Sequence, residues 1–294
     1  MSVFEFLEAS PLAFWVTAAL LGLIVGSFLN VLSLRLPAKM DAEWRAMCEE
    51  LAGKEPEPPV KTWFGLRYLI EPPSTCRQCG HRIRAWENIP VLSYLFLRGR
   101  CSACGSAIGV RYPVVEAVSG LMTLVVATQF APDAAFLGAA VFTWTLIALS
   151  VIDIDHQQLP DQLTLPLLWL GLLFNLNGVY TDLASAVVGA VAGYAFLWLV
   201  FHVFNLLTGK EGMGYGDFKL FAAFGAWFGW QLLPQILLVA SLVGAVVGIG
   251  LIVLRGRDRQ LPIPFGPYLA LAGWIALLWG ERINDAYLRA SGLS

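Results

Sequence analysis

The chain has 294 residues, of which 57% are hydrophobic and only 14% carry a formal charge, and its net charge is -2. Soluble domains average about 25% charged residues. The composition therefore excludes a disordered chain, a basic nucleic-acid-binding domain and an ordinary cytosolic enzyme. Since a large soluble core would also be apolar, the uncharged runs have to decide between a soluble and a membrane protein.

Seven uncharged runs follow one another along the chain, at residues 9–34, 117–132, 134–152, 162–181, 183–209, 220–254 and 260–280. A bilayer span needs about 20 apolar residues. The run 220–254 is too long for one span, and Pro234 stands near its middle between Gln231 and Gln235, so we divide it there. Because only helices satisfy their own backbone in lipid, the sequence predicts an all-α polytopic membrane protein of about eight transmembrane helices.

The basic residues agree with eight spans. Of the 19 Lys and Arg, 17 then fall on one side, and only Arg282 and Arg289 fall on the other. The positive-inside rule places the larger group in the cytoplasm and both termini outside. The first ten residues contain two glutamates and no Lys or Arg. We therefore expect a retained first helix rather than a signal peptide.

Residues 35–112 form the one long polar block, between a first helix in residues 1–34 and a seven-helix domain in 113–294. The block includes a loop-like Pro/Glu stretch at 54–59, and it is too small for a large core of its own. Its two Cys-x-x-Cys pairs are separated by 21 residues: Cys76, Cys79, Cys101 and Cys104. Four thiolates at this spacing predict a structural zinc site in a small cytoplasmic domain between helices 1 and 2.

Two alternatives to this zinc site remain open. The cysteines could form two disulfides, although the cytoplasm disfavours them. His81 could also replace one of the ligands. Gly80 and Gly105 follow the two pairs and would let backbone amides turn toward the sulfurs, whereas Cys48 is unpaired and we expect it to be inert.

Carboxylates at two helix boundaries are the candidate reactive groups, because charges within a span are costly and usually mark function. Asp153, Asp155 and Asp161 stand where the third helix reaches the cytoplasmic face, and Asp217 stands where the sixth leaves it. Asp153 and Asp155 point to different faces of a helix, so only one of them can face Asp217. Two facing aspartates would share a proton and perform acid–base catalysis.

The segment before Asp217 is rich in glycine. Gly212, Gly214 and Gly216 permit positive φ and close approach of the backbone to another helix or to an extended substrate. The alternative reading is a flexible loop with a helix-capping aspartate.

The stretch from Asp153 to Asp161, together with Gly214-Tyr-Gly-Asp217, resembles the type IV prepilin peptidases, which are membrane aspartic proteases of the GxGD class. The segments 26–31, 87–90, 98–101 and 111–116 match other motifs of that family, so the resemblance covers nearly the whole chain. It implies that Asp153 and Asp217 are the catalytic pair. Asp155, Asp161, Gly214 and Gly216 would support the site or contact substrate.

The resemblance also implies substrates and cofactors. The enzyme would lie in the bacterial inner membrane and cut the short basic leader from prepilins and type II secretion pseudopilins at the cytoplasmic face. Relatives with four cysteines then methylate the new N-terminus with S-adenosylmethionine, and Gly99 is a candidate residue for that activity. No nucleic-acid partner is implied, and the oligomeric state stays open.

Three alternatives remain. The chain could be a peptidase without methyltransferase activity. It could be a metal-dependent lipid-phosphate transferase, with Asp153, Asp155 and Asp161 as Mg²⁺ ligands. It could also be a non-catalytic membrane assembly or transport protein whose acidic side chains merely line a helix interface.

Overall fold

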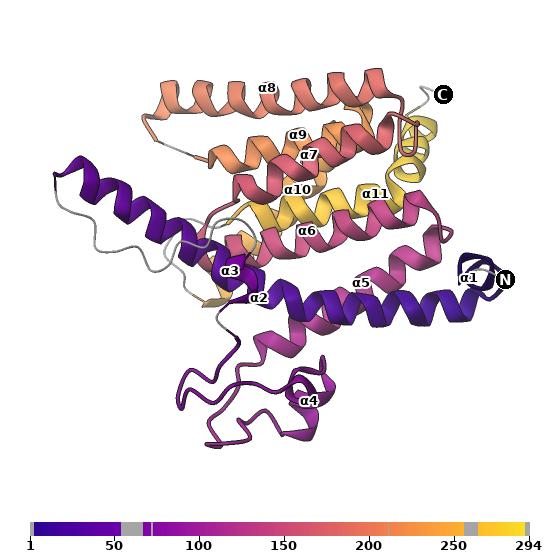
Figure 1. Ribbon diagram of the computed structural model, residues 1–294. Coiled ribbons are helices and arrows are strands. Elements are labelled where there is room, and N and C mark those ends of the chain that lie inside the picture. Colours follow the sequence, from indigo (N-terminus) through magenta and orange to yellow (C-terminus); the bar gives the residue numbers. More distant parts are fainter. Residues whose placement is uncertain (1–2, 54–66, 72, 211, 256–263, 292–294) are drawn as a thin grey trace. The chain divides into compact units, whose positions relative to one another are not determined.

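The computed structural model describes residues 3–53, 67–71, 73–210, 212–255 and 264–291, and this part of the chain is helical, with no strand. Its longer helices are α2 (Pro11–Leu51), α5 (Arg111–Gln129), α6 (Ala134–His156), α7 (Asp161–Asn175), α8 (Leu183–Thr208), α9 (Tyr215–Phe228), α10 (Leu233–Arg255) and α11 (Gly266–Ala290) (Figure 1). The shorter ones are α1 (Val3–Ala9), α3 (Arg67–Ile70), η1 (Ala85–Asn88), α4 (Leu92–Phe96) and η2 (Trp230–Leu232). The Pro/Glu stretch 54–59, Arg257 and Arg259 lie outside the described residues.

The long helices occur where the uncharged runs predicted them, so the all-α class is confirmed. Five segments of the described chain are long and apolar enough to cross a membrane: Pro11–Leu51, Arg111–Gln129, Ala134–His156, Leu183–Thr208 and Trp230–Leu254. α7 and α9 have only 15 and 14 residues, below the usual ~20 for a span. The number of eight spans therefore stays a prediction.

The predicted break in the run 220–254 is confirmed. α9 ends at Phe228, Gly229 adopts a φ of 77°, and η2 leads into α10 at Leu233. A φ in this region favours glycine because it has no Cβ. Pro234 follows in the first turn of α10, where its missing N–H removes no helical hydrogen bond.

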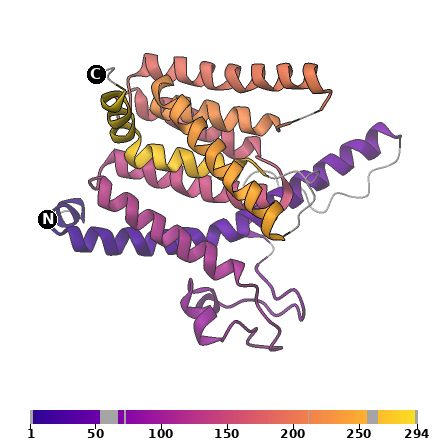
Figure 2. The same cartoon turned by 180° about the vertical axis from the view of Figure 1, so that it is seen from behind.

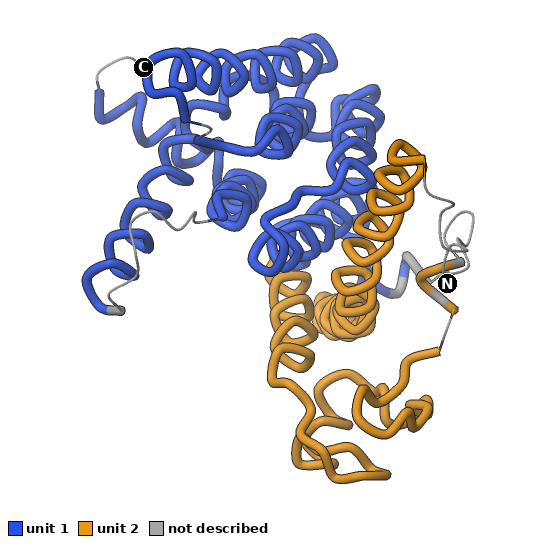
Figure 3. The backbone as a smooth tube through the Cα atoms, turned by 90° about the vertical axis from the view of Figure 1, so that its left-hand side faces the viewer, with its two compact units in different colours: residues 1–9, 126–294 blue, residues 10–125 orange. Residues whose placement is uncertain are grey.

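The chain forms two compact units, coloured orange and blue in Figure 3. Unit 2 comprises residues 10–125, and unit 1 comprises residues 1–9 and 126–294. α2, which contains the predicted first span, therefore clusters with the cysteine-containing block and most of α5. The division at residues 34 and 112 expected from the sequence remains untested.

In unit 2, small residues let α2 and α5 approach closely. A Cβ added to Gly22 would lie 2.6 Å from Thr123 Oγ1, and one on Gly26 would lie 2.8 Å from the Cα of Glu116. Two small residues four positions apart are the usual device for close helix contact in membranes. At the other end of this contact, Arg111 Nη2 donates to Ser33 Oγ at 3.2 Å, so the two helices run antiparallel.

α2 does not end at the first charged residue, Arg35, but continues to Leu51 with Pro37 inside it. The Arg35 guanidinium donates to the carbonyls of Tyr68 and Leu69, both at 3.1 Å. These bonds fix α3 against α2 after the chain has returned from the end of that helix.

Unit 1 is a helical bundle with α9 at its centre (Figure 1), and Figure 2 shows α10 crossing the bundle obliquely. Ten residues of α9 are buried in the core of unit 1: Phe218, Leu220, Phe221, Ala222, Ala223, Phe224, Gly225, Ala226, Trp227 and Phe228. α8 packs on one side of α9 by glycine contacts, because a Cβ on Gly189 would lie 2.5 Å from the Gly225 carbonyl oxygen.

Aromatic packing and side-chain hydrogen bonds hold α9 against α6 and α7. The ring of Phe142 from α6 lies 4.8 Å from that of Trp227. The Trp227 indole donates to the carbonyl of Leu167 at 2.7 Å, and Asn175 Nδ2 donates to the carbonyl of Ala226 at 2.8 Å. Buried polar groups are stable only with such partners. These bonds therefore set the position of α9, and with it that of Asp217, relative to α7.

Candidate active site and metal centre

Asp153 lies in the last turn of α6 and is only 6% exposed. The helix ends three residues later, where Gln157 adopts a left-handed conformation and its N–H donates to the Asp153 carbonyl at 2.9 Å. The side chain accepts from the backbone N–H of Gly266, the first residue of α11, into Oδ2 at 2.9 Å. A Cβ on Gly266 would lie 2.7 Å from that oxygen. A side chain at residue 266 would therefore displace the Asp153 carboxylate.

Asp217 lies in the first turn of α9 and is also 6% exposed. Its Oδ2 accepts from the N–H of Gly214 at 3.2 Å. Its Oδ1 is buried and has no hydrogen-bond partner among the described residues. One carboxylate oxygen is thus fixed and the other is left for a further group.

The glycines before Asp217 serve close approach and not unusual backbone torsion. Gly214 is extended, with φ −83° and ψ 150°, and neither Gly212 nor Gly216 has a positive φ. A Cβ on Gly216 would lie 2.6 Å from Cβ of Leu159, and one on Gly212 would lie 2.9 Å from the Phe204 ring. Of the two properties expected for this loop, only close approach is observed.

The structure brings the Asp153 and Asp217 segments together in unit 1. Leu159 lies between α6 and α7 and contacts the positions of both Gly216 and Gly266. Two buried carboxylates from α6 and α9 therefore share one site, with amides from the loop before α9 and from the start of α11.

The other two aspartates differ from this pair in their exposure to solvent. Asp155 is exposed. Asp161 is exposed at the start of α7, where both of its oxygens accept from Lys219 Nζ, at 2.6 and 2.8 Å. No group of metal-ligating spacing includes Asp153, Asp155 and Asp161 in the described part of the chain. This arrangement counts against the Mg²⁺ alternative.

The four predicted cysteines form a compact cluster in unit 2. Cys76, Cys79, Cys101 and Cys104 all place their sulfurs within 4.8 Å of one another, and Cys76 Sγ lies 3.9 Å from Cys104 Sγ. A tetrahedral zinc with Zn–S bonds of ~2.3 Å separates its sulfurs by about 3.8 Å. All four thiols are free. The cluster therefore fits zinc, and the disulfide alternative is not supported.

Each Cys-x-x-Cys pair forms the same turn. The N–H groups of Gly80 and Gly105 each donate at 2.9 Å to the first cysteine of their pair, and both glycines have φ of 70°. Amides of Cys79 and Gln78 point at the Cys76 sulfur and lower the pKa of that thiol to about 6. Hydrogen bonds to the charged form favour the thiolate that a metal requires.

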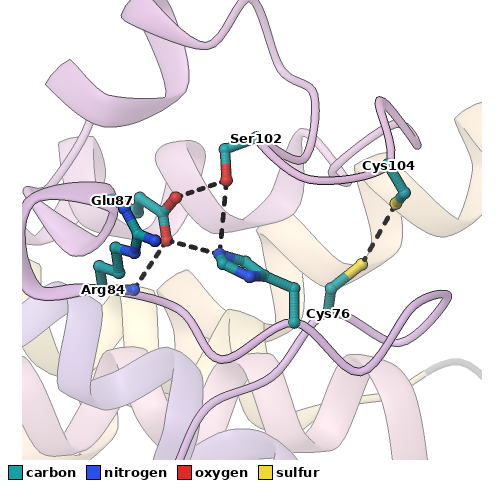
Figure 4. A network of polar contacts seen from close by, with 6 residues as sticks. Cys76, Arg84, Glu87, Ser102 and Cys104 are labelled. Atoms are coloured by element: carbon teal, nitrogen blue, oxygen red, sulfur yellow. Dashed lines mark hydrogen bonds and ion pairs between the residues drawn. The ribbon is translucent and has the colours of Figure 1, made fainter.

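His81 is not grouped with the four thiols. Its Nε2 lies 3.2 Å from Glu87 Oε2. Glu87 also accepts from the N–H of Arg84 at 2.7 Å and from Ser102 Oγ at 2.5 Å (Figure 4). These bonds, that of Arg84 foremost, lower the pKa of Glu87 to about 2. The carboxylate thus joins the two cysteine turns.

Gly99 has a conformational role. Its φ is 67°, and a Cβ there would lie 2.8 Å from Tyr94 Oη. Its N–H donates to the Tyr94 carbonyl at 2.8 Å, and its carbonyl accepts from Ile108 at 2.7 Å. A part for Gly99 in binding a methyl donor stays a prediction.

The sequence did not predict several residues in or beside these two sites, among them Leu159, Lys219 and Gly266. The signal for Lys219 was a lone cation two positions after Asp217 in an otherwise apolar helix. Gly266 carried a weaker one, a Gly-Pro step at the start of a helix. Neither signal identifies the distant partner.

The fold and the two sites define a multi-pass membrane protein with a pair of buried aspartates and a four-thiolate metal centre. Two family models match the chain, the bacterial peptidase A24 N-terminal domain over residues 20–130 and the type IV leader peptidase family over residues 140–249. The protein belongs to the type IV leader peptidase family.

Similar proteins cover nearly the whole chain. A Pseudomonas aeruginosa protein named prepilin leader peptidase/N-methyltransferase is 53% identical over 292 residues, covering 99% of each chain. Proteins of the same name from Aeromonas salmonicida and Xanthomonas campestris are 53% and 44% identical, over 97% and 98% of this chain and 97% and 99% of theirs. No solved structure gives a significant match.

Proposed function

We propose that this protein is a membrane aspartic endopeptidase that removes the short basic leader from prepilins and pseudopilins and then methylates the new N-terminal amine. The proposal is supported by family membership, by relatives of that name along the entire chain, and above all by the buried Asp153–Asp217 pair. The protein would reside in the bacterial inner membrane with this pair facing the cytoplasm and both termini in the periplasm.

The two aspartates take different roles. The Gly266 amide donates to Asp153 and stabilises its ionised form. Asp217 also accepts one backbone amide, from Gly214, but its other oxygen is buried with no hydrogen-bond partner among the described residues, so its ionised form is the costlier one. Asp153 would therefore act as the base and Asp217 as the protonated acid, with the pair sharing one proton and titrating as a unit.

Peptide hydrolysis follows from these roles. Asp153 takes a proton from a water molecule as the water oxygen attacks the scissile carbonyl carbon, and Asp217 gives its proton to the carbonyl oxygen. The tetrahedral intermediate then collapses as the C–N bond breaks: the proton held by Asp153 passes to the leaving amine, and one hydroxyl of the intermediate returns a proton to Asp217, which restores the starting pair. No metal takes part in these steps. A zinc held by the four cysteines would have no open position for a catalytic water and would serve to fold unit 2.

The methyl donor implied by the second half of the relatives' name is S-adenosylmethionine, a sulfonium cation. A groove of about 530 Å³ in unit 2 has Arg82 and Arg84 in its lining, and these repel a cation. A second groove of about 500 Å³ is lined mainly by apolar residues of α2 and the 85–90 segment. Neither groove identifies a site for the donor, so methylation is proposed from the relatives and assigned to no residue.

The test uses purified protein in liposomes with a prepilin that carries a basic leader and a glycine at the cut, read by mass spectrometry with and without S-adenosylmethionine. We expect Asp153→Asn and Asp217→Asn each to reduce cleavage by at least ~100-fold. Asp285→Asn, an exposed aspartate near the end of α11, is the matched control and should keep most activity. Cleavage by Asp153→Asn at the rate of the control would refute the assignment of Asp153 and Asp217 as the catalytic pair.

The same assay separates the alternatives. A peptidase without the second activity would give only the unmethylated product. A lipid-phosphate transferase would require divalent metal and ignore the leader. A non-catalytic assembly protein would give no product, and its function would tolerate both substitutions.

A further inference from the structure

The part of unit 2 between the two cysteine turns exposes large apolar side chains. Trp86, Ile89, Leu92, Leu95 and Phe96 are exposed by 50%, 46%, 53%, 64% and 83%, and we call them the apolar patch. They lie in η1, in α4 and in the link between these helices. Water-exposed apolar side chains in one short segment indicate a binding surface. The question is what covers it.

The contacts of this segment place it at the depth of the membrane. The N–H of Val91 donates to Glu116 Oε2 at 2.8 Å, and Glu116 lies one and a half turns inside α5, about 7 Å from Arg111. The position of Gly26 on α2 adjoins Glu116. Gly26 is nine residues before Arg35, the first charge on that helix, or about 13 Å along its axis.

A groove between the same elements gives a second measure of depth. Its walls are formed by Ile24, Phe28 and Val31 of α2 on one side and by Asn88, Ile89 and Pro90 on the other. These α2 residues belong to the uncharged run that ends at residue 34. The 88–91 segment therefore lies beside the membrane-spanning part of α2 and not beyond its end.

Charges flank the apolar patch on both sides. Arg82 and Arg84 precede it and Arg98 and Arg100 follow it, and all four side chains are exposed. Tryptophan and other large apolar residues bracketed by arginines are typical of segments that lie in the headgroup region with their apolar side chains among the acyl chains. Arginines near the surface also attract anionic lipids.

We propose that residues 85–97 insert into the cytoplasmic leaflet, with the apolar patch in contact with acyl chains and the flanking arginines at the phosphates of anionic lipids. The polypeptide leads into the membrane span α5 on one side, and the Val91–Glu116 bond ties the segment to that span. The metal-binding block is thus an interfacial domain rather than one surrounded by water. Glu116 fixes the depth of insertion through its bond to Val91.

Site-directed spin labelling of the full-length, zinc-loaded protein tests this. In a Cys48→Ser background, Phe96→Cys is labelled with a nitroxide in vesicles of phosphatidylethanolamine and phosphatidylglycerol. Access of oxygen, which is enriched in lipid, is compared with access of a water-soluble nickel chelate. Ala103→Cys, at an exposed position in the second cysteine turn, is the matched control. The Cys48→Ser protein without an added cysteine measures the signal from any nitroxide attached to the four zinc ligands.

We expect the ratio of oxygen to nickel access to be several-fold higher at residue 96 than at residue 103. A label at residue 96 that the nickel chelate reaches as readily as at residue 103 would overturn the proposal. Low access of both probes would also overturn it, because it would indicate a protein partner such as a second copy. Leu95→Cys provides a second position if Phe96→Cys loses zinc. The readout does not depend on peptidase activity.

Discussion

At the scale of single residues, the acidic side chains at the end of α6 and at the starts of α7 and α9 differ in their surroundings. Asp153 and Asp217 are buried, with one backbone amide each. Asp161 is exposed and held by Lys219, which lies two positions after Asp217. This ion pair connects the start of α7 to the first turns of α9.

The Asp161–Lys219 pair should matter for geometry more than for stability. An exposed ion pair is worth ~0–1 kcal/mol, so Asp161→Asn and Lys219→Gln should each lower the free energy of unfolding by less than about 1 kcal/mol. We expect each change to reduce kcat for leader cleavage several-fold, with little change in KM. The double variant should lose no more than the worse single variant, because both changes break the same contact.

Cleavage kinetics of the four proteins give this result as a double-mutant cycle. Additive losses, or a KM that rises only in Asp161→Asn, would instead assign Asp161 a direct contact with substrate. Asp285→Asn again serves as the control for removal of an exposed carboxylate.

At the scale of elements, α9 depends on the absence of side chains at its contact with α8. A Cβ on Gly225 would overlap the backbone of Gly189, and one on Gly193 would lie 2.8 Å from the carbonyl oxygen of Phe221. No side chain here can simply rotate away, since the opposing atoms are backbone. The helix that carries Asp217 is therefore held by backbone-to-backbone packing.

Gly225→Ala should destabilise unit 1 by about 1–3 kcal/mol, the usual cost of overpacking, and should lower peptidase activity by displacing α9. Gly250→Ala in α10 is the matched control, because nothing lies within 4 Å of the added Cβ. Thermal unfolding in detergent should show a lower Tm for the first variant and an equal or higher Tm for the second. Equal Tm values would show that α8 can shift without cost.

The sequence predicted the helices, the break near Pro234, the aspartates and the four cysteines, because each has a local signature. It did not predict that Gly266 would hold Asp153, since these residues are 113 positions apart. It also placed the end of the first helix near Arg35, whereas tertiary contacts let α2 continue to Leu51.

At the scale of the whole molecule, the metal centre and the aspartate pair belong to different compact units. The described helices of unit 1 contain none of the four cysteine ligands. Loss of the metal should therefore damage the block around residues 73–109 and leave the helical bundle largely folded.

Cys76→Ser, or removal of zinc by a strong chelator, should reduce methylation more than cleavage. It should also make the bonds after Arg82 and Arg84 more sensitive to trypsin, since both arginines are exposed beside the cysteine turns. Mass spectrometry of the pilin product measures both activities in one sample, and Cys48→Ser is the control for loss of a free thiol. Equal loss of both activities would argue for one integrated site.

The course of α2 has a practical consequence. The helix travels about 24 Å beyond Arg35 before it ends at Leu51, yet the chain is back beside Arg35 at Tyr68, where Lys39 Nζ also lies 4.5 Å from the ring. Residues 35 and 68 therefore lie side by side, although 32 residues separate them in the sequence. A fluorescent reporter inserted after Gly53 would lie just beyond the end of α2. It would be far from Arg35 and Lys39 and would leave their contacts undisturbed.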